Sequence, residues 1–131
     1  MNIENISMLI AAIVAALILF QSVFVAPAIN KLLHKEQASV FLRYIWPKFF
    51  MIIGLLNLFG FIIELNPTQK TNKYLFLSSF IIMLVCYLVT PLINQAKDTS
   101  KNRRWVVLHF STVLLTFIVL VLNILILCFG N

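Results

Sequence analysis

Hydrophobic residues run along the chain in four long segments that short polar stretches separate. We place these segments at about residues 6–29, 48–65, 74–93 and 105–129. Each is close to the roughly 20 apolar residues that an α-helix needs to cross a bilayer. A backbone in lipid must satisfy its own hydrogen bonds, so such segments predict transmembrane helices. The expected fold class is therefore all-α: a four-transmembrane-helix bundle of two consecutive hairpins, forming one integral membrane domain over residues 1–131.

The polar stretch between the first two segments has a helical pattern of its own. Within residues 35–46 (KEQASVFLRYIW), the apolar residues Ala38, Phe41, Leu42 and Ile45 recur at helical spacing. Charged residues lie between them. This pattern is typical of an amphipathic helix at the membrane interface. Proline is well tolerated in the first turn of a helix. We therefore expect a short interfacial helix that leads into a second span with Pro47 in its first turn.

Composition supports a membrane location. Of the 131 residues, 62% are hydrophobic and only 11% are charged. A soluble domain of this size has too much surface for its volume to hide so much apolar area. The bilayer is therefore the first partner that the sequence predicts.

The distribution of Lys and Arg predicts the orientation. Three of these residues lie between the first and second segments, with Lys48 at the very start of the second; two lie between the second and third segments, and four between the third and fourth. Because cytoplasmic loops are enriched in Lys and Arg, we expect both termini outside and a location in a bacterial cytoplasmic (inner) membrane. The basic residues lie beside apolar segments and not on a polar face, so no nucleic-acid partner is expected.

A short motif recurs where the first and third segments end. Residues 25–30 (VAPAIN) and 89–94 (VTPLIN) share Val, Pro, Ile and Asn at matching positions. The match indicates either a parallel repeat of the two hairpins or a shared composition. Proline removes a backbone donor and can kink or end a helix. We therefore expect a helix-end motif in both places, in which an asparagine satisfies exposed carbonyls, formed by Pro27 with Asn30 and by Pro91 with Asn94.

Small residues form rows along the first segment. Ser7, Ala11 and Ala15 make one row, and Ala12 and Ala16 make another. Such rows let helix backbones approach closely in lipid. They predict that this helix packs inside the bundle or against a second copy, so a homo-oligomer through the four alanines is expected.

Polar residues within the apolar segments are the candidates for function, because burying them in hydrocarbon is costly unless they find partners. We expect a polar crevice open to the cytoplasm, formed by Gln21, Asn57, His109 and Thr112. The alternative is that these side chains only join helices through hydrogen bonds. No carboxylate lies deep inside a predicted span, because Glu64 stands at the outer end of the second. This argues against a proton-coupled exporter and against a Ser/His/Asp hydrolase.

The histidine and cysteine residues limit which cofactors the chain could hold. Cys86 and Cys128 fall near opposite ends of their helices, too far apart for a disulfide, and no CxxC motif occurs. A His34–His109 pair is the remaining candidate for haem or metal ligation. We expect a non-enzymatic membrane protein that handles a small solute or a metal ion, or that scaffolds partners. The alternative is a membrane haem or metal redox enzyme using His109, and no cofactor is assigned.

These motifs together resemble the family called domain of unknown function 4149, whose eukaryotic relatives are transmembrane protein 205-like. The resemblance is carried by residues 24–27 (FVAP), Phe41, residues 46–50 (WPKFF), Asn57-Leu58, Pro91 with Asn94, Arg104-Trp105 and Leu108-His109. It implies a four-helix integral membrane protein and no settled activity. The family pattern has Ser and Asn three and seven residues after the His, where this chain has Thr112 and Thr116. Any role of the Asn carboxamide would therefore be lost at position 116.

Overall fold

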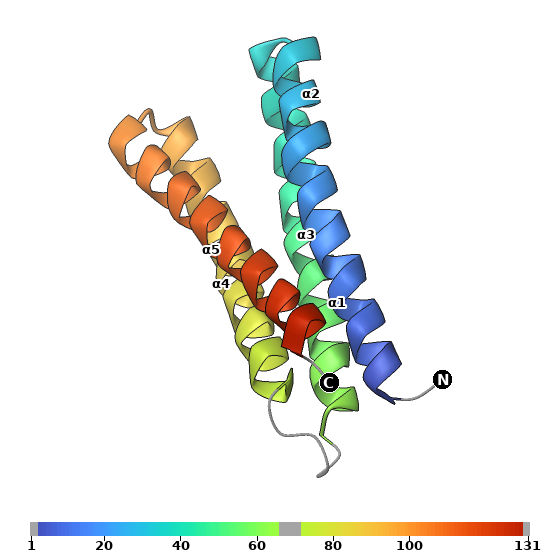
Figure 1. The fold of residues 1–131 in the computed structure, drawn as a ribbon. Coiled ribbons are helices and arrows are strands. Elements are labelled where there is room, and N and C mark those ends of the chain that lie inside the picture. The colour runs from blue at the N-terminus through green and yellow to red at the C-terminus, as the bar shows by residue number, and fades with distance from the viewer. Residues whose placement is uncertain (1–2, 66–71, 130–131) are drawn as a thin grey trace.

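The structure, a computed structural model, describes residues 3–65 and 72–129, and side chains from residue 5 onward. Its elements are α1 (Ile3–Phe20), η1 (Gln21–Val25), α2 (Ala26–Leu32), α3 (Lys35–Ile63), α4 (Asn72–Asp98) and α5 (Asn102–Phe129) (Figure 1). The π-helical turn η1 joins α1 and α2 without a break. The described residues thus contain four helices long and apolar enough to cross a membrane. The predicted four-helix bundle is confirmed.

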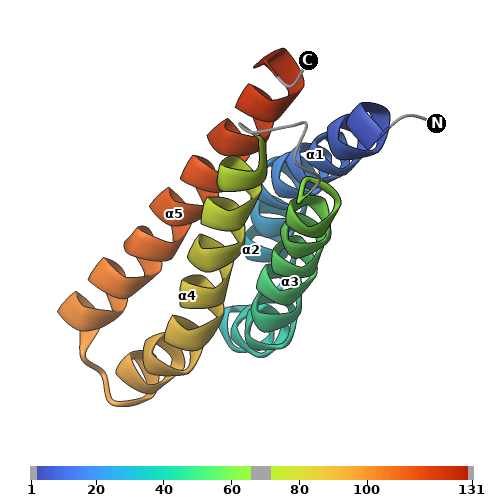
Figure 2. The same cartoon turned by 90° about the horizontal axis from the view of Figure 1, so that it is seen from below.

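The helices form two pairs that separate at one end. α3 packs along α4, α4 along α5, and α1 contacts both α3 and α5. The α1–α3 pair and the α4–α5 pair lie close together where α1 begins and α5 ends (Figures 1 and 2). They splay apart toward the end that carries α2 and the turn between α4 and α5. We call this the basic end, because Lys31, Lys35, Lys97 and Lys101 lie there.

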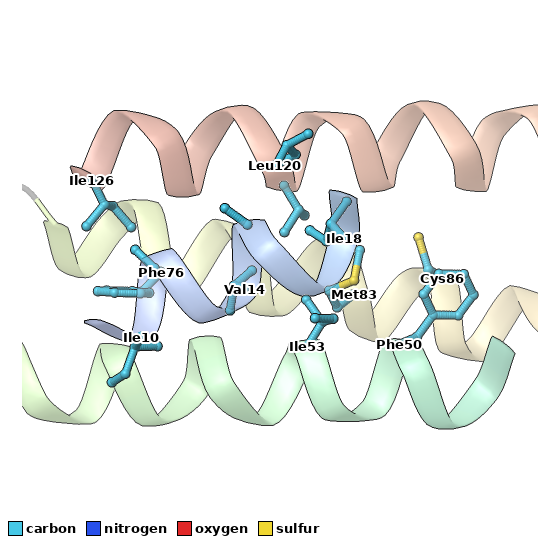
Figure 3. Close-up of a cluster of buried hydrophobic side chains, with 13 residues drawn as sticks. Ile10, Val14, Ile18, Phe50, Ile53, Phe76, Met83, Cys86, Leu120 and Ile126 are labelled. Carbon is cyan, nitrogen blue, oxygen red and sulfur yellow. The ribbon is translucent and has the colours of Figure 1, made fainter. Parts of the chain in front are cut away.

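An apolar core fills the closed part of the bundle. All four long helices contribute, with Val14, Ile53, Met83 and Val119 fully buried. Figure 3 shows these layers running from Ile126 and Phe76 to Cys86 and Phe50. The outward faces carry large apolar side chains instead of polar ones. Because only lipid solvates such faces favourably, the chain is an integral membrane protein.

A glycine on α3 allows the closest approach of α3 and α4. A Cβ atom added at Gly60 would lie 2.6 Å from Cε1 of Phe76, a separation that real Cβ atoms do not show. Gly54, two turns earlier on the same helix, has more room, since its added Cβ would lie 3.5 Å from Cβ of Met83. The fully buried Phe76 ring therefore depends on the missing side chain of Gly60.

The amphipathic segment 35–46 is helical as expected, but it is not a separate helix. α3 runs without interruption from Lys35 to Ile63 and contains Pro47 in its interior. Proline removes one donor, here the one that would bond the carbonyl of Arg43, and its fixed φ still suits a helix. A complete break would expose more backbone groups in an apolar environment. The helix therefore continues through the proline.

The prolines at positions 27 and 91 do not end their helices either. α2 continues past Pro27 to Leu32, and α4 continues past Pro91 to Asp98. The π-helical turn ends at Val25, two residues before Pro27, so the altered hydrogen bonding lies in the turn that the proline ring would crowd. Asn30 and Asn94 accordingly lie inside helices and are not the caps that the sequence predicted.

Candidate functional site

A cavity of about 380 Å³ lies between the two helix pairs on the side of the basic end. Its lining comes from all four long helices. At its deep end, Ile18, Phe50 and Leu120 line the cavity and also belong to the apolar core. Figure 3 labels these three side chains on three different helices. The core therefore closes the cavity toward the opposite end of the bundle, and we call this cavity the crevice.

Aromatic rings form much of the crevice wall. The indole of Trp46 stacks on the ring of Phe50, with centroids 5.5 Å apart and planes 28° apart. On α5 the indole of Trp105 lies parallel to the imidazole of His109, with centroids 5.4 Å apart. Both tryptophans of the chain thus line the crevice. Stacked rings give it fixed, largely apolar walls.

The crevice reaches the lipid-facing surface between α1 and α5. Leu19 on α1, with Val113 and Phe117 on α5, line the cavity. The same side chains are 47%, 46% and 58% exposed on the outer surface of the bundle. Residues that belong to both surfaces form the edge of an opening. The crevice therefore opens sideways, where acyl chains would surround the protein.

Two threonine hydroxyl groups of α5 line the crevice, and each already donates a hydrogen bond within its own helix. Thr112 Oγ1 donates to the carbonyl oxygen of His109, and Thr116 Oγ1 donates to that of Thr112, both at 2.8 Å. Each hydroxyl proton is thereby used within the helix. The oxygen lone pairs stay available as weak acceptors, so this wall adds polarity without adding charge.

Cationic side chains mark the rim of the crevice. Arg43 of α3 and Lys97 of α4 line it, and the described lining contains no carboxylate. The guanidinium of Arg43 donates to both oxygens of Asp98, from Nη1 to Oδ2 at 3.1 Å and from Nη2 to Oδ1. Within the described part of the chain, Nε of Arg43 is buried and has no partner. The rim is therefore electropositive and keeps an unused donor.

Comparison with protein families assigns the chain. The family model described as Domain of unknown function (DUF4149) matches residues 8–102. The chain belongs to this family. The DUF4149 match includes the crevice residues of α1, α3 and α4 and ends before Trp105 and His109 on α5. Comparisons with curated proteins and with solved structures found no match.

In this DUF4149 protein the crevice brings together part of the polar site that the sequence predicted. His109 and Thr112 line it, and Asn94 lines it from α4. Gln21 does not line it: the side chain is buried in η1, and Nε2 has no partner among the described residues. Asn57 lies in the core instead, bonded to Asn123 of α5. Pro27, Asn30 and Pro91 are not lining residues either.

Sequence reasoning missed the cations and the aromatic walls of this site. Thr90, Asn94 and Lys97 all line the crevice from α4. Their spacing of four and three residues places them on one helix face. The shared face of these three residues could therefore have been predicted from the sequence. Arg43 belongs to segment 35–46, for which the sequence predicts a short helix at the membrane interface. The continuous α3 carries it to the crevice rim instead.

The structure does not bring the two histidines together at the crevice. His34 is the N-cap residue of α3 and is not a lining residue, whereas His109 is. No group of three or more His, Cys, Asp or Glu side chains gathers in the described residues. Cys86 is buried, Cys128 is exposed, and both are free thiols. Among the described lining residues His109 is thus the only histidine, so the candidate His34–His109 pair does not form at the crevice.

Proposed function

We propose that this DUF4149 protein is a non-enzymatic binding protein for a small amphipathic organic anion. The supporting observation is the pairing of a mainly apolar crevice with a rim that carries Arg43 and Lys97. An apolar chain or ring system would fill the crevice. A carboxylate or phosphate head group would face the two cations, which bind such groups through charge-assisted hydrogen bonds.

The size of the crevice favours a single-chain ligand. Its volume of about 380 Å³ is near the lower end of the range for small-molecule sites, about 300–1,000 Å³. A complete two-chain phospholipid would exceed this space. The lateral opening between α1 and α5 suits a ligand that enters from the membrane with its chain first.

We further propose that the basic end faces the cytoplasm of a bacterial cell, with both termini outside. The Lys and Arg distribution along the sequence supports this orientation. The crevice would then open to the cytoplasm and to the inner leaflet. An anionic amphiphile of the inner leaflet would have its head group level with the crevice rim.

Metal-ion handling receives less support from the same geometry. Two cationic side chains at the rim would repel a metal cation. Among the described lining residues, His109 is the one of a type that commonly binds metals, and its ring stacks on Trp105. A neutral or anionic ligand suits these walls better.

Intrinsic fluorescence tests the proposal, because Trp46 and Trp105 both line the crevice. The purified protein would be placed in nanodiscs of neutral phosphatidylcholine and titrated with a brominated fatty acid, whose bromines quench indole fluorescence on contact. We expect saturable quenching. A brominated lysophosphatidate distinguishes a phosphate from a carboxylate head group, and a brominated alcohol of equal chain length tests the need for charge.

Two substitutions show whether quenching reports the crevice. Thr112→Phe would fill the space beside His109 and should abolish the saturable component. Val106→Phe is the matched control, since Val106 is 52% exposed on α5 and is not a lining residue. Non-saturating quenching that is equal for all three probes and unchanged in Thr112→Phe would refute the proposal.

A further inference from the structure

We propose that Asp98 is a resident carboxylate that determines the ligand specificity of the crevice, because an anionic head group has to displace it from Arg43. This inference rests on the proposed function and concerns the selectivity of the same site. Asp98 itself does not line the cavity, so its proposed effect on binding acts through Arg43.

The contact between Arg43 and Asp98 already has the form of a bound anion. The guanidinium meets both carboxylate oxygens through two parallel donors. This fork geometry is the one in which Arg binds free carboxylates and phosphates. The Asp98 carboxylate therefore occupies the guanidinium donors of Arg43 that would otherwise bind the head group of a ligand.

Arg43 can contact Asp98 and a ligand from different directions. Its side chain lines the crevice, whereas Asp98 is not a lining residue and is 58% exposed. The remaining guanidinium donor, Nε, is buried without a partner in the described part of the chain. Buried donors in native structures are normally satisfied. A head group in the crevice supplies an acceptor for Nε and competes with Asp98 for the other two donors.

The ion pair is of a kind that a ligand can displace. The side chains of Arg43 and Asp98 are 34% and 58% exposed, so water and salt screen their attraction. Exposed ion pairs contribute little net stability. A ligand that also buries an apolar chain in the crevice has a second source of binding free energy, whereas Asp98 has none.

The place of Asp98 on its helix is otherwise unfavourable. It is the last residue of α4, at the negative end of the helix dipole. Lys97, its neighbour, lines the crevice. Helix stability therefore does not account for a carboxylate at this position, whereas compensating the charge of Arg43 while the crevice is empty does. Without Asp98 two cations would face the crevice with no compensating charge.

The test is an Asp98→Asn variant of the full chain in neutral nanodiscs, titrated with the brominated fatty acid and the brominated alcohol. Removing the competing charge should tighten binding of the fatty acid roughly fivefold. Binding of the alcohol should not change. Glu36→Gln is the matched control, because it removes one negative charge near the start of α3 from a residue that neither lines the cavity nor pairs with Arg43. Asp98→Glu should keep the wild-type affinity.

A double variant identifies the side chain through which Asp98 acts. Arg43→Gln should weaken fatty-acid binding, and Asp98→Asn should then have no further effect. Equal affinities of Asp98→Asn and Glu36→Gln, with saturable wild-type binding, would refute this inference and leave the proposed function standing. Tighter binding of both probes in Asp98→Asn would also refute it, since that result indicates easier access and not selectivity. No saturable binding in any variant would refute the proposed function itself.

Discussion

Asn123 of α5 donates a hydrogen bond from Nδ2 to Oδ1 of Asn57 on α3, at 3.2 Å, and both side chains are fully buried. The two helices lie diagonally across the bundle, because each packs against both α1 and α4, which separate them. Each amide also bonds its own helix: Asn57 Nδ2 donates to the carbonyl of Ile53 at 2.8 Å and Asn123 Nδ2 to that of Val119 at 2.9 Å. This bridge therefore joins the two helix pairs through the centre of the closed half.

A double-mutant cycle on Asn57 and Asn123 should show a favourable coupling. Interhelical hydrogen bonds in membrane proteins contribute about 0.6 kcal/mol on average, so a coupling near that value is expected for Asn57→Ala and Asn123→Ala. The free energy of unfolding in a denaturing detergent measures it. Strict additivity of the two substitutions would show that the bridge adds nothing.

A matched control for this cycle is Ser111→Ala. Ser111 Oγ also bonds a backbone carbonyl, that of Val107 at 2.8 Å, but the side chain is exposed and joins no second helix. Its loss should change the free energy of unfolding by less than the loss of either asparagine. A larger effect of Ser111→Ala would assign the stabilisation to bonds within single helices.

The sequence could identify Asn57 as costly to bury but could not name its partner. Asn123 is 66 positions away, and pairing them requires knowledge of which helices face each other. The four spans themselves were predictable, because each is an apolar run of the length that a bilayer demands. The same runs contain too little amphipathic pattern to show which face points inward.

The errors in helix boundaries have one physical source. The sequence was read as if prolines at positions 27, 47 and 91 began or ended helices. In the structure each lies within a continuous helical rod, because a single missing donor costs less than a break in an apolar environment. Extending α3 and α4 through the prolines brings Arg43 and Lys97 to the crevice, which sequence reasoning therefore missed.

Two glycines of α3 should respond differently to the same substitution. Gly60→Ala would force its new Cβ into the Phe76 ring, so we expect α3 and α4 to separate and the free energy of unfolding to fall by about 1–3 kcal/mol. Gly54→Ala meets only ordinary contacts and should stabilise the helix by up to about 1 kcal/mol. Thermal unfolding of the two variants provides the comparison. Equal destabilisation would show that the close approach at Gly60 is not important.

Cysteine labelling should establish the orientation that the charge distribution predicts. In a Cys128→Ala background, Thr99→Cys lies in the turn between α4 and α5, and Asn2→Cys precedes α1. Cys86 can remain because it is fully buried. A membrane-impermeant maleimide added to intact cells should label position 2 and should reach position 99 only after permeabilisation. Labelling of position 99 from outside would place the crevice on the outer face.

The two rows of small residues on α1 separate in the structure, and only one remains available to a second copy. Ser7, Ala11 and Ala15 are buried within the bundle, whereas Ala16 is exposed and Ala12 is partly exposed. Association of two copies, if it uses this helix, should therefore depend on Ala12 and Ala16, where small side chains permit close backbone approach. Ala16→Leu should shift the monomer–dimer equilibrium toward the monomer roughly tenfold, about 1.4 kcal/mol.

Single-molecule photobleaching in nanodiscs at several protein-to-lipid ratios measures that equilibrium. Val121→Phe is the matched control, because Val121 is 40% exposed on α5 and Phe adds an apolar volume comparable with that added by Ala16→Leu. A monomeric wild-type protein at every ratio would contradict the expected self-association. An equal shift in both variants would assign the contact to a general lipid-facing surface instead of the Ala12–Ala16 row, since only that row offers a narrow strip where two helix backbones can meet.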